Sequence, residues 1–225
     1  MPEVPDKVAL PALIALGAGL LVWYLGGNEV MRRRAHRLAV WSKRGIDPLG
    51  GRQSVQWLTQ QAFRLQVEAP RVAGMKAVTL TGLVESWDVP MVWLWNRLHG
   101  RRDMVVLSLT LRDQPVWGFE VFRPKSILAG DARHLARQEG WVEQPLGPDL
   151  VLAAGGDGPR HLATSLVDAL DGDERGRLVR LAVRRQGASL SLALNVPNPT
   201  SLDPARLGRL AQRLAEQAQA RERRT

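Results

Sequence analysis

The 225-residue sequence contains no cysteine. This absence excludes disulfide bonds, zinc sites with thiolate ligands, cysteine nucleophiles and lipid anchors attached to cysteine. Proteins on either side of a membrane can lack cysteine, so the absence leaves the compartment open. The chain is long enough to form a domain with a hydrophobic core.

The sequence also lacks the short motifs of phosphate-binding loops and serine hydrolases. It contains no G-x-x-x-x-G-K-[ST], G-x-G-x-x-G or G-x-S-x-G. Residues 155–158 (Gly-Gly-Asp-Gly) precede an expected helix, and such a turn can bind phosphate through free N–H groups. Asp157 favours a plain turn, because its carboxylate would cap the helix and repel an anion. We expect no catalytic residue, no cofactor and no enzymatic activity.

Side chains with the spacing of a metal site are missing too. None of the four histidines has another histidine or a glutamate three or four residues away, as two ligands on one helical face would require. A group of acidic residues lies near an expected helix end, where such side chains are usually solvated, and it does not match a calcium-binding loop. We expect no metal site in either set. The histidines are His36, His99, His134 and His161, and the acidic residues are Asp168, Asp171, Asp173 and Glu174.

Charge is absent from residues 8–25 (VALPALIALGAGLLVWYL). A helix over this run would be about 27 Å long, close to the ~30 Å hydrocarbon core of a bilayer. Pro11 falls in its first turn, where a missing N–H costs little, and Trp23 and Tyr24 fall near the end that would meet the membrane interface. The run predicts a transmembrane helix over residues 8–27, after a short tail of residues 1–7.

Two other interpretations of the run fit less well. A buried core helix of this length usually has a polar face. A cleaved signal peptide usually has a basic start, a shorter apolar run and a cleavage site of small residues, and here the start is nearly neutral and arginines follow the run.

The net charge of +9 is concentrated just after this run. Residues 1–31 contain three acidic residues and one basic residue, whereas residues 32–52 contain seven basic residues and one acidic residue. By the positive-inside rule, this distribution places the long C-terminal part of the chain in the cytoplasm, with the single-pass helix in the cell (inner) membrane of a bacterium. The basic residues next to the run, here called the collar, are expected to contact anionic lipid headgroups. They are Arg32, Arg33, Arg34, Arg37, Lys43 and Arg44.

Small residues gather on one face of the expected membrane helix. Ala12, Ala15 and Gly19 share this face, and Gly26 continues it. Such a face allows a second helix to approach closely, which would favour a protein partner or a homo-oligomer. The alternative, that alanine and glycine are simply common in membrane helices, stays open.

The helix is expected to continue from Val30 to Arg44 as a basic segment on the membrane surface, with Met31, Ala35 and Leu38 on one apolar stripe that ends at Trp41. Another helix is expected over residues 53–66. These segments predict a basic, helical juxtamembrane region over residues 28–76. A soluble α+β domain is expected to follow over residues 77–225.

The first half of this domain is expected to be rich in strands. Val and Trp content and turn residues predict an antiparallel meander of four strands, over residues 78–85, 89–96, 104–111 and 116–122. Four tryptophans here predict a sheet core, or alternatively a binding surface. They are Trp87, Trp93, Trp95 and Trp117. The basic turn at residues 99–103 is expected to be a solvated tip, and we expect no nucleic-acid binding.

The second half predicts an alternation of helices and strands. A β-hairpin is expected from the alternation around Val179–Val183 and Leu190–Leu194, on either side of a Gly-containing turn. Asp203 and Pro204 are expected to start a final amphipathic helix. The other expected elements are a short helix over residues 132–138, a strand over 150–153 and a helix over 159–170.

This order of elements resembles a diffuse class of membrane-anchored bacterial proteins of unknown function. The resemblance covers about residues 77–220, through the meander near 79–122 and the region 149–218. It implies an α+β fold and an envelope context, and it transfers no functional residue. The sequence therefore predicts a membrane-held, non-enzymatic interaction or accessory module. The alternative is a membrane-tethered domain that binds or hydrolyses a small ligand, using the turn at 155–158 or the tryptophan-rich sheet.

Overall fold

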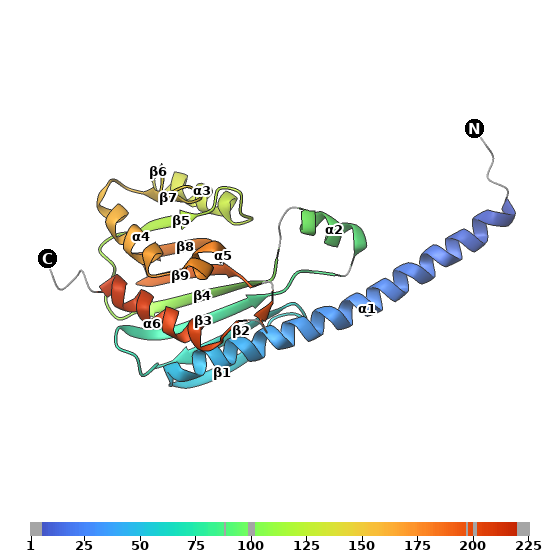
Figure 1. Ribbon diagram of the computed structural model, residues 1–225, viewed down its shortest axis with the longest axis horizontal. Helices are drawn as coiled ribbons and strands as arrows, with labels where there is room; N and C mark the ends of the chain where they lie inside the picture. The colour runs from blue at the N-terminus through green and yellow to red at the C-terminus, as the bar shows by residue number, and fades with distance from the viewer. Residues whose placement is uncertain (1–5, 88, 99–101, 197, 200–201, 220–225) are drawn as a thin grey trace.

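The computed structural model describes residues 6–87, 89–98, 102–196, 198–199 and 202–219. Over these ranges the chain forms one nine-stranded antiparallel sheet in the order β1-β2-β3-β4-β9-β8-β5-β7-β6, packed with helices (Figure 1). The helices are α1 (Asp6–Ile46), α2 (Pro90–Leu98), α3 (Ala129–Gln138), α4 (Gly158–Asp168), α5 (Gly172–Arg177) and α6 (Ala205–Gln219). The strands are β1 (Arg52–Trp57), β2 (Ala62–Glu68), β3 (Met75–Leu83), β4 (Met104–Leu111), β5 (Phe119–Phe122), β6 (Val142–Pro145), β7 (Val151–Ala154), β8 (Leu178–Arg184) and β9 (Ser189–Asn195). The expected α+β class is confirmed.

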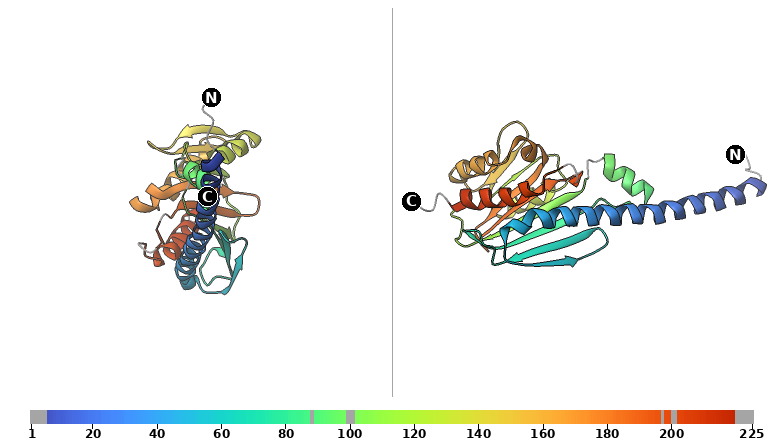
Figure 2. Two further views of the ribbon diagram at one scale, coloured as in Figure 1. Left: turned by 90° about the vertical axis from the view of Figure 1, so that its right-hand side faces the viewer. Right: turned by 60° about the horizontal axis from the view of Figure 1, so that its bottom comes forward.

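The first helix, α1, is continuous over 41 residues, which corresponds to about 60 Å. Its outer half projects away from the body of the molecule, and its inner half lies against the sheet (Figures 1 and 2). In the inner half, Met31, Ala35 and Leu38 are at most 1% exposed, and Trp41 packs against the same cluster. The predicted apolar stripe is therefore confirmed, but it packs on the sheet and does not lie on a membrane surface.

The first four strands pair in chain order, each antiparallel to the next. A meander is therefore present, but its strands differ from the predicted ones. The helix expected over residues 53–66 is wrong, because these residues belong to β1, the turn after it and β2. In β2, Phe63, Leu65 and Val67 are buried and alternate with more exposed polar residues, which is the period of a strand. The sheet thus begins well before the expected domain boundary at residue 77.

Two further strand predictions are corrected by the structure. Residues 89–96 were expected to form a strand, but α2 occupies Pro90–Leu98. Although valine and tryptophan favour strands, proline fits the first position of a helix, and the Trp93 N–H bonds to the Val89 carbonyl as a first helical turn requires. The strand expected over residues 116–122 is shortened to β5, which lies between β8 and β7 and is separated from β4 by two strands.

Most of the C-terminal elements agree with the sequence. The β8–β9 hairpin, the strand β7 and the helices α3, α4 and α6 lie where they are expected, within a few residues. Asp203 accepts a 3.0 Å hydrogen bond from the Ala205 N–H at the start of α6. The predicted cap by Asp157 is wrong, since its side chain accepts no bond from the N-terminal N–H groups of α4.

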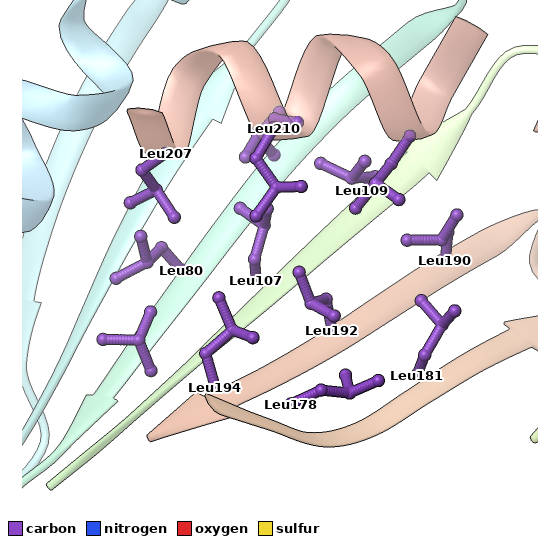
Figure 3. Packing of buried hydrophobic residues seen from close by; sticks show 14 of the residues in the cluster. Leu80, Leu107, Leu109, Leu178, Leu181, Leu190, Leu192, Leu194, Leu207 and Leu210 are labelled. Carbon is purple, nitrogen blue, oxygen red and sulfur yellow. The ribbon is translucent and has the colours of Figure 1, made fainter. Parts of the chain in front are cut away.

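The main core lies between the sheet and the helices α1, α4 and α6. Alternate residues of β3, β4, β8 and β9 supply leucines to this side, and Leu207 and Leu210 of α6 lie over them (Figure 3). Burial of each such leucine contributes roughly 1.5–3 kcal/mol relative to exposure. α1 and α6 meet closely at glycines, because a Cβ at Gly45 would lie 2.7 Å from the Pro204 carbonyl oxygen, and one at Gly208 would lie 2.6 Å from the Gly45 carbonyl oxygen. The inner half of α1 is therefore a structural part of the domain.

The opposite side of the sheet is more polar. α3 packs on this side, where Phe122 and Ala153 contact its alanines. Beyond α3, partly or fully exposed polar side chains lie in register across β2, β3, β4 and β9. We call this surface the open face, and it comprises Gln66, Thr79, Ser108, Thr110 and Ser191.

Candidate functional site

The outer half of α1 exposes an apolar surface that the described chain does not cover. Of the described helices, α1 is the one long and apolar enough to cross a membrane, with a mean hydropathy of 1.8 over its most apolar 18 residues, of which 6% are buried. Leu13, Leu16 and Leu21 are 59–66% exposed. A core helix of a soluble protein would be mostly buried, whereas this apolar surface is exposed, which is unfavourable in water.

Three tryptophans meet where the outer half of α1 ends. The ring centroids of Trp23 in α1 and Trp93 in α2 are 5.8 Å apart, and those of Trp93 and Trp87, which precedes α2, are 5.1 Å apart. The Trp23 Nε1–H donates a 3.0 Å hydrogen bond to the Trp87 carbonyl oxygen. Gly27 permits this approach, because a Cβ there would lie 2.6 Å from the same oxygen. This tryptophan cluster (Trp23, Trp87 and Trp93) fastens the α2 segment to α1.

The cluster corrects the predicted role of the tryptophans. Trp87 and Trp93 contact α1, not the sheet core. Trp95 is 64% exposed on α2, and Trp117 is 42% exposed just before β5. Sequence analysis favoured a sheet core for all four over a binding surface, because it assigned residues 89–96 and 116–122 as strands.

The helix α2 carries its apolar side chains on the outside. Met91 and Leu98 are 75% and 74% exposed, whereas the polar Asn96 is 6% exposed. This is the reverse of a surface helix in a soluble protein, which buries its apolar stripe and exposes its polar residues. We call the exposed side the α2 outer face, and it comprises Met91, Val92, Leu94, Trp95 and Leu98.

A buried ion pair joins α1 to the sheet beside the tryptophan cluster. The Arg34 guanidinium lies 2.8 Å from the Asp103 carboxylate, with side chains 18% and 3% exposed. Asp103 also accepts a 2.9 Å hydrogen bond from the Glu85 N–H, and Arg34 lies 5.7 Å from the centre of the Trp87 ring. Burial raises the pKa of Asp103, although the bond from Glu85 and the charge of Arg34 oppose that shift. Arg34 therefore connects α1 to the residue just before β4 and to the segment between β3 and α2.

Glu85 is the least satisfied group at this junction. Its side chain is 1% exposed, and neither carboxylate oxygen has a hydrogen-bond partner among the described residues. The Arg97 guanidinium lies 4.0 Å away. Burial raises the pKa of Glu85, because desolvation of the carboxylate outweighs the nearby arginines.

The structure divides the predicted collar into an exposed group, one residue engaged inside the protein, and a pair at the far end of α1. Arg32 and Arg33 are exposed and pair with Glu29 at 3.0 and 2.5 Å, and they lower the pKa of Glu29, with Arg33 as the main cause. Arg37 is also exposed, whereas Arg34 is engaged inside the protein.

Lys43 and Arg44 form the third part of the collar. They lie at the far end of α1, in its last turn. At 1.5 Å per residue they are roughly 27 Å or more beyond Leu25, where the uncharged run ends. If the span ends at Leu25, these two residues lie well beyond that membrane surface, and their contact with headgroups stays a prediction.

An open groove of about 980 Å³ lies between the collar and the turn that joins β1 to β2. Three arginines and one glutamate line it, so its charge is net positive and suits an anionic group. Trp57, which is 48% exposed, forms part of the opposite wall. The lining residues are Glu29, Arg32, Arg33, His36, Arg37, Trp57, Thr59 and Gln60.

The predicted helix-packing residues meet no other part of the described chain. Ala12, Ala15 and Gly19 all lie on the exposed half of α1, and a Cβ at Gly19 would have no neighbour within 4 Å. Their role in a helix contact stays a prediction.

Sequence reasoning missed a second buried ionic cluster, on the side of the sheet that α3 covers. Glu120 of β5 is fully buried and accepts hydrogen bonds of 2.9 and 2.6 Å from Arg180 and of 2.5 Å from Arg184. Both arginines flank Ala182, which lies opposite Glu120 in the β5–β8 register. The sequence signal for this cluster was its spacing. Arg180 and Arg184 lie two residues before and after Ala182, so in a strand all three side chains point to the same face as Glu120. The cluster fixes the register of β5 against β8.

The acidic residues near α5 cap this helix or form ion pairs with its arginines. Asp171 and Glu174 form a capping box at the helix start, and Asp168 pairs with Arg175 at 2.8 Å. The described residues contain no group of three His, Asp or Glu side chains that could hold a metal ion. His99, with Gly100 and Arg101 of the predicted basic turn, lies outside the described residues.

A smaller groove, of about 560 Å³, adjoins the turn at residues 155–158. Two tryptophans, Trp117 and Trp141, line it together with Gly155 and the basic residues Arg184 and Arg185. Glu139, Gly118, Pro159 and Gln186 complete the lining. This Trp117 groove brings together the glycine turn and one tryptophan that the sequence had singled out separately.

No family model matches this chain, and no curated protein matches it significantly. The resemblance to membrane-anchored bacterial proteins therefore stays a prediction.

Proposed function

We propose that this chain is a single-pass membrane protein whose α+β domain is a non-enzymatic interaction module at the cytoplasmic face of the membrane. The observation that carries the proposal is the continuity of α1. Its outer half exposes large apolar side chains, and its inner half belongs to the domain core. A helix without a break would hold the domain at a fixed distance from the bilayer and make it rotate and tilt together with the span.

The charges near the end of the span support the cytoplasmic orientation. Arg32, Arg33 and Arg37 are exposed within about three to four turns of Leu25, inside the distance over which basic residues determine topology. On the cytoplasmic surface they would also attract anionic headgroups, at ~1 kcal/mol for each well-placed basic residue.

The open face is the surface best suited to a protein partner. Thr79, Ser108 and Ser191 lie side by side across three strands, and the Ser108 and Ser191 hydroxyl oxygens are 3.4 Å apart. Hydroxyl groups can donate and accept, and their short side chains lose little conformational entropy when a partner binds. An anchored protein that offered this face would recruit or position other proteins at the membrane.

The test is proximity labelling in living cells from a tag at the C-terminus of the full chain. A dominant set of cytoplasmic and inner-membrane proteins is expected. Ser108→Arg, which places a long charged side chain in the centre of the open face, should remove the main labelled partner. The matched change Gln138→Arg, on the exposed end of α3, should leave it. Labelling of exported proteins would reject the cytoplasmic orientation, and equal labelling by both variants would reject the open face.

The Trp117 groove supports a second candidate, a tethered domain that binds a small anionic ligand. Its two tryptophans could stack on a ring, and Arg184 and Arg185 could pair with a carboxylate or phosphate. A thermal-shift screen of the full chain with small organic anions tests this function. A hit lost in Trp141→Ala would support it, and a hit that persists in that variant would place the ligand elsewhere.

A further inference from the structure

We infer that α2 is a second membrane contact, a short helix whose outer face lies in the interfacial layer of the same leaflet in which the α1 span ends. This inference rests on the proposed membrane anchoring and extends it to a segment that the sequence predicts as a sheet strand. The partner is the lipid surface itself.

The position of α2, beside the end of the apolar half of α1, supports this inference. The tryptophan cluster places Trp93 of α2 against Trp23, which lies two residues before the uncharged run ends at Leu25. Figures 1 and 2 show α2 beside α1, set apart from the body of the sheet. If the outer half of α1 spans a bilayer, α2 therefore lies at the depth of the headgroups and the first acyl carbons.

The exposed surface of α2 is also unusually apolar. Outside α1, the largest concentration of exposed large hydrophobic residues in the described chain is in α2 and the residue before it. Met91 and Leu98, the most exposed of these, project from the first and last turns of the same helix. An apolar surface of this kind is unfavourable in water, whereas it suits the acyl boundary of a bilayer.

Length and charge specify how α2 would lie. Nine residues correspond to about 13 Å, less than half of the hydrocarbon core, so the helix cannot span and would lie in the interface. Arg97 is in its last turn, and the Arg102 guanidinium donates a 3.3 Å hydrogen bond to the Arg97 carbonyl oxygen. Basic side chains at the domain-facing end would reach the phosphate layer while Met91 and Leu94 face the acyl chains.

Two membrane contacts have a consequence that one span does not have. A single span leaves the domain free to rotate about the bilayer normal and to tilt with the helix. A second contact on one side of α1 selects one tilt, and thereby sets which edge of the sheet faces the membrane.

The experiment uses the absence of cysteine, which allows single spin labels in the full chain. Met91→Cys and Leu98→Cys probe the α2 outer face, Leu16→Cys probes the span, and Val142→Cys on β6 is a matched control that is 60% exposed. Each protein is placed in lipid nanodiscs that contain one copy, and label relaxation is measured with oxygen, which partitions into lipid, and with a water-soluble nickel chelate.

Labels at Met91 and Leu98 should be severalfold more accessible to oxygen than to nickel, like Leu16 and unlike Val142. If both behave like Val142 while Leu16 reports lipid, the α2 inference is overturned and the anchor stands. If Leu16 also reports water, the proposed membrane anchoring fails. If the α2 labels become protected only in discs with two copies and broaden one another, the face is covered by a second copy and the inference is overturned.

Discussion

At the scale of single residues, the junction between α1 and the sheet contains two buried acids with unequal partners. Asp103 has the Arg34 guanidinium at 2.8 Å and a backbone N–H, whereas Glu85 has a guanidinium no closer than 4.0 Å. Burial raises the pKa of both carboxyls. A raised pKa in the folded state means that folding favours the protonated form, so each acid contributes more stability at low pH than at neutral pH.

Glu85→Gln should therefore stabilise the protein at neutral pH. The amide keeps the shape and removes a buried charge that lacks a hydrogen-bond partner among the described residues, whose nearest guanidinium is 4.0 Å away, and whose burial costs roughly 1–3 kcal/mol. Because wild-type Glu85 regains its stability as it protonates, the difference should shrink as the pH falls toward the ordinary glutamate pKa of about 4.3. Urea unfolding in detergent micelles between pH 4.5 and 7.5 measures this difference. Glu139→Gln, at an exposed position, is the control and should show no trend.

Glu120→Ala tests the other buried charge cluster. It leaves Arg180 and Arg184 without their carboxylate, and breaking a buried pair costs about 3–5 kcal/mol. We expect the low end, ~3 kcal/mol, because the two arginine side chains are 19% and 32% exposed. Glu143→Ala breaks an exposed pair with Arg133 and should change stability by less than ~1 kcal/mol. Equal losses in the two variants would show that Glu120 is not the anchor of β5 against β8.

At the scale of elements, the sequence predicted the strands and helices that a regular periodicity of apolar residues indicates. It missed elements whose conformation depends on tertiary contacts. Leu190, Leu192 and Leu194 alternate regularly, and β9 lies where they indicate. In α2, the run from Val92 to Trp95 has the composition of a strand, and its helical state depends on a proline at the start and on packing against α1, which no local pattern reports.

The candidate site shows the same division. Periodicity placed Met31, Ala35 and Leu38 on one face, but it could not show that the sheet, and not lipid, covers that face. Arg34 looks identical to Arg33 in the sequence, although one pairs with a buried aspartate and the other with an exposed glutamate. The difference arises from a residue almost 70 positions later, Asp103, so only the tertiary structure supplies it.

The attachment of α2 can be tested with two adjacent glycines of α1. Gly27→Ala would place a Cβ 2.6 Å from the Trp87 carbonyl oxygen, so it should displace the α2 segment and the bond from Trp23. Gly26→Ala has no neighbour within 4 Å and should be neutral or stabilising by up to ~1 kcal/mol, as expected for alanine in a helix. Protease sensitivity of residues 86–98 should rise in the first variant and stay unchanged in the second.

Packing of the inner half of α1 gives a prediction for the same element. Leu38→Ala removes a side chain that is 1% exposed and should destabilise the domain by ~2–5 kcal/mol. Val40→Ala, two residues later and 37% exposed, should cost less than ~1 kcal/mol. Urea midpoints of the full chain in micelles compare the two. Similar midpoints would mean that α1 is not an integral part of the core.

At the scale of the whole molecule, the exposed part of the collar should determine orientation. The triple variant Arg32→Glu, Arg33→Glu and Arg37→Glu spares Arg34, and with it the bond to Asp103, while it reverses the charge beside the span. We expect a mixture of orientations. In intact cells, a membrane-impermeant maleimide should label Val142→Cys in this background and leave it unlabelled with the natural collar.

The control for orientation is a triple variant with the same change in net charge far from the span. Arg71→Glu, Arg137→Glu and Arg185→Glu are exposed and lie more than 40 residues beyond Leu25, outside the range of the positive-inside rule. Val142→Cys should stay unlabelled in this background. Labelling with the natural collar would show that the domain is exported.

Because α1 is unbroken, any rotation of its outer half about the helix axis is passed directly to the domain. Each residue of an α-helix turns the chain by about 100°, so the side of the span that meets lipid or another helix has a fixed phase relative to the open face of the sheet. One residue inserted between Asn28 and Glu29 would rotate the domain relative to the span by slightly more than a quarter turn. It would increase the distance between them by only ~1.5 Å. Seven inserted residues would nearly restore the original rotation of the domain while lengthening the helix by ~10 Å. Partner recruitment that recovers with seven residues and fails with one would show that direction, more than reach, is what this helix transmits.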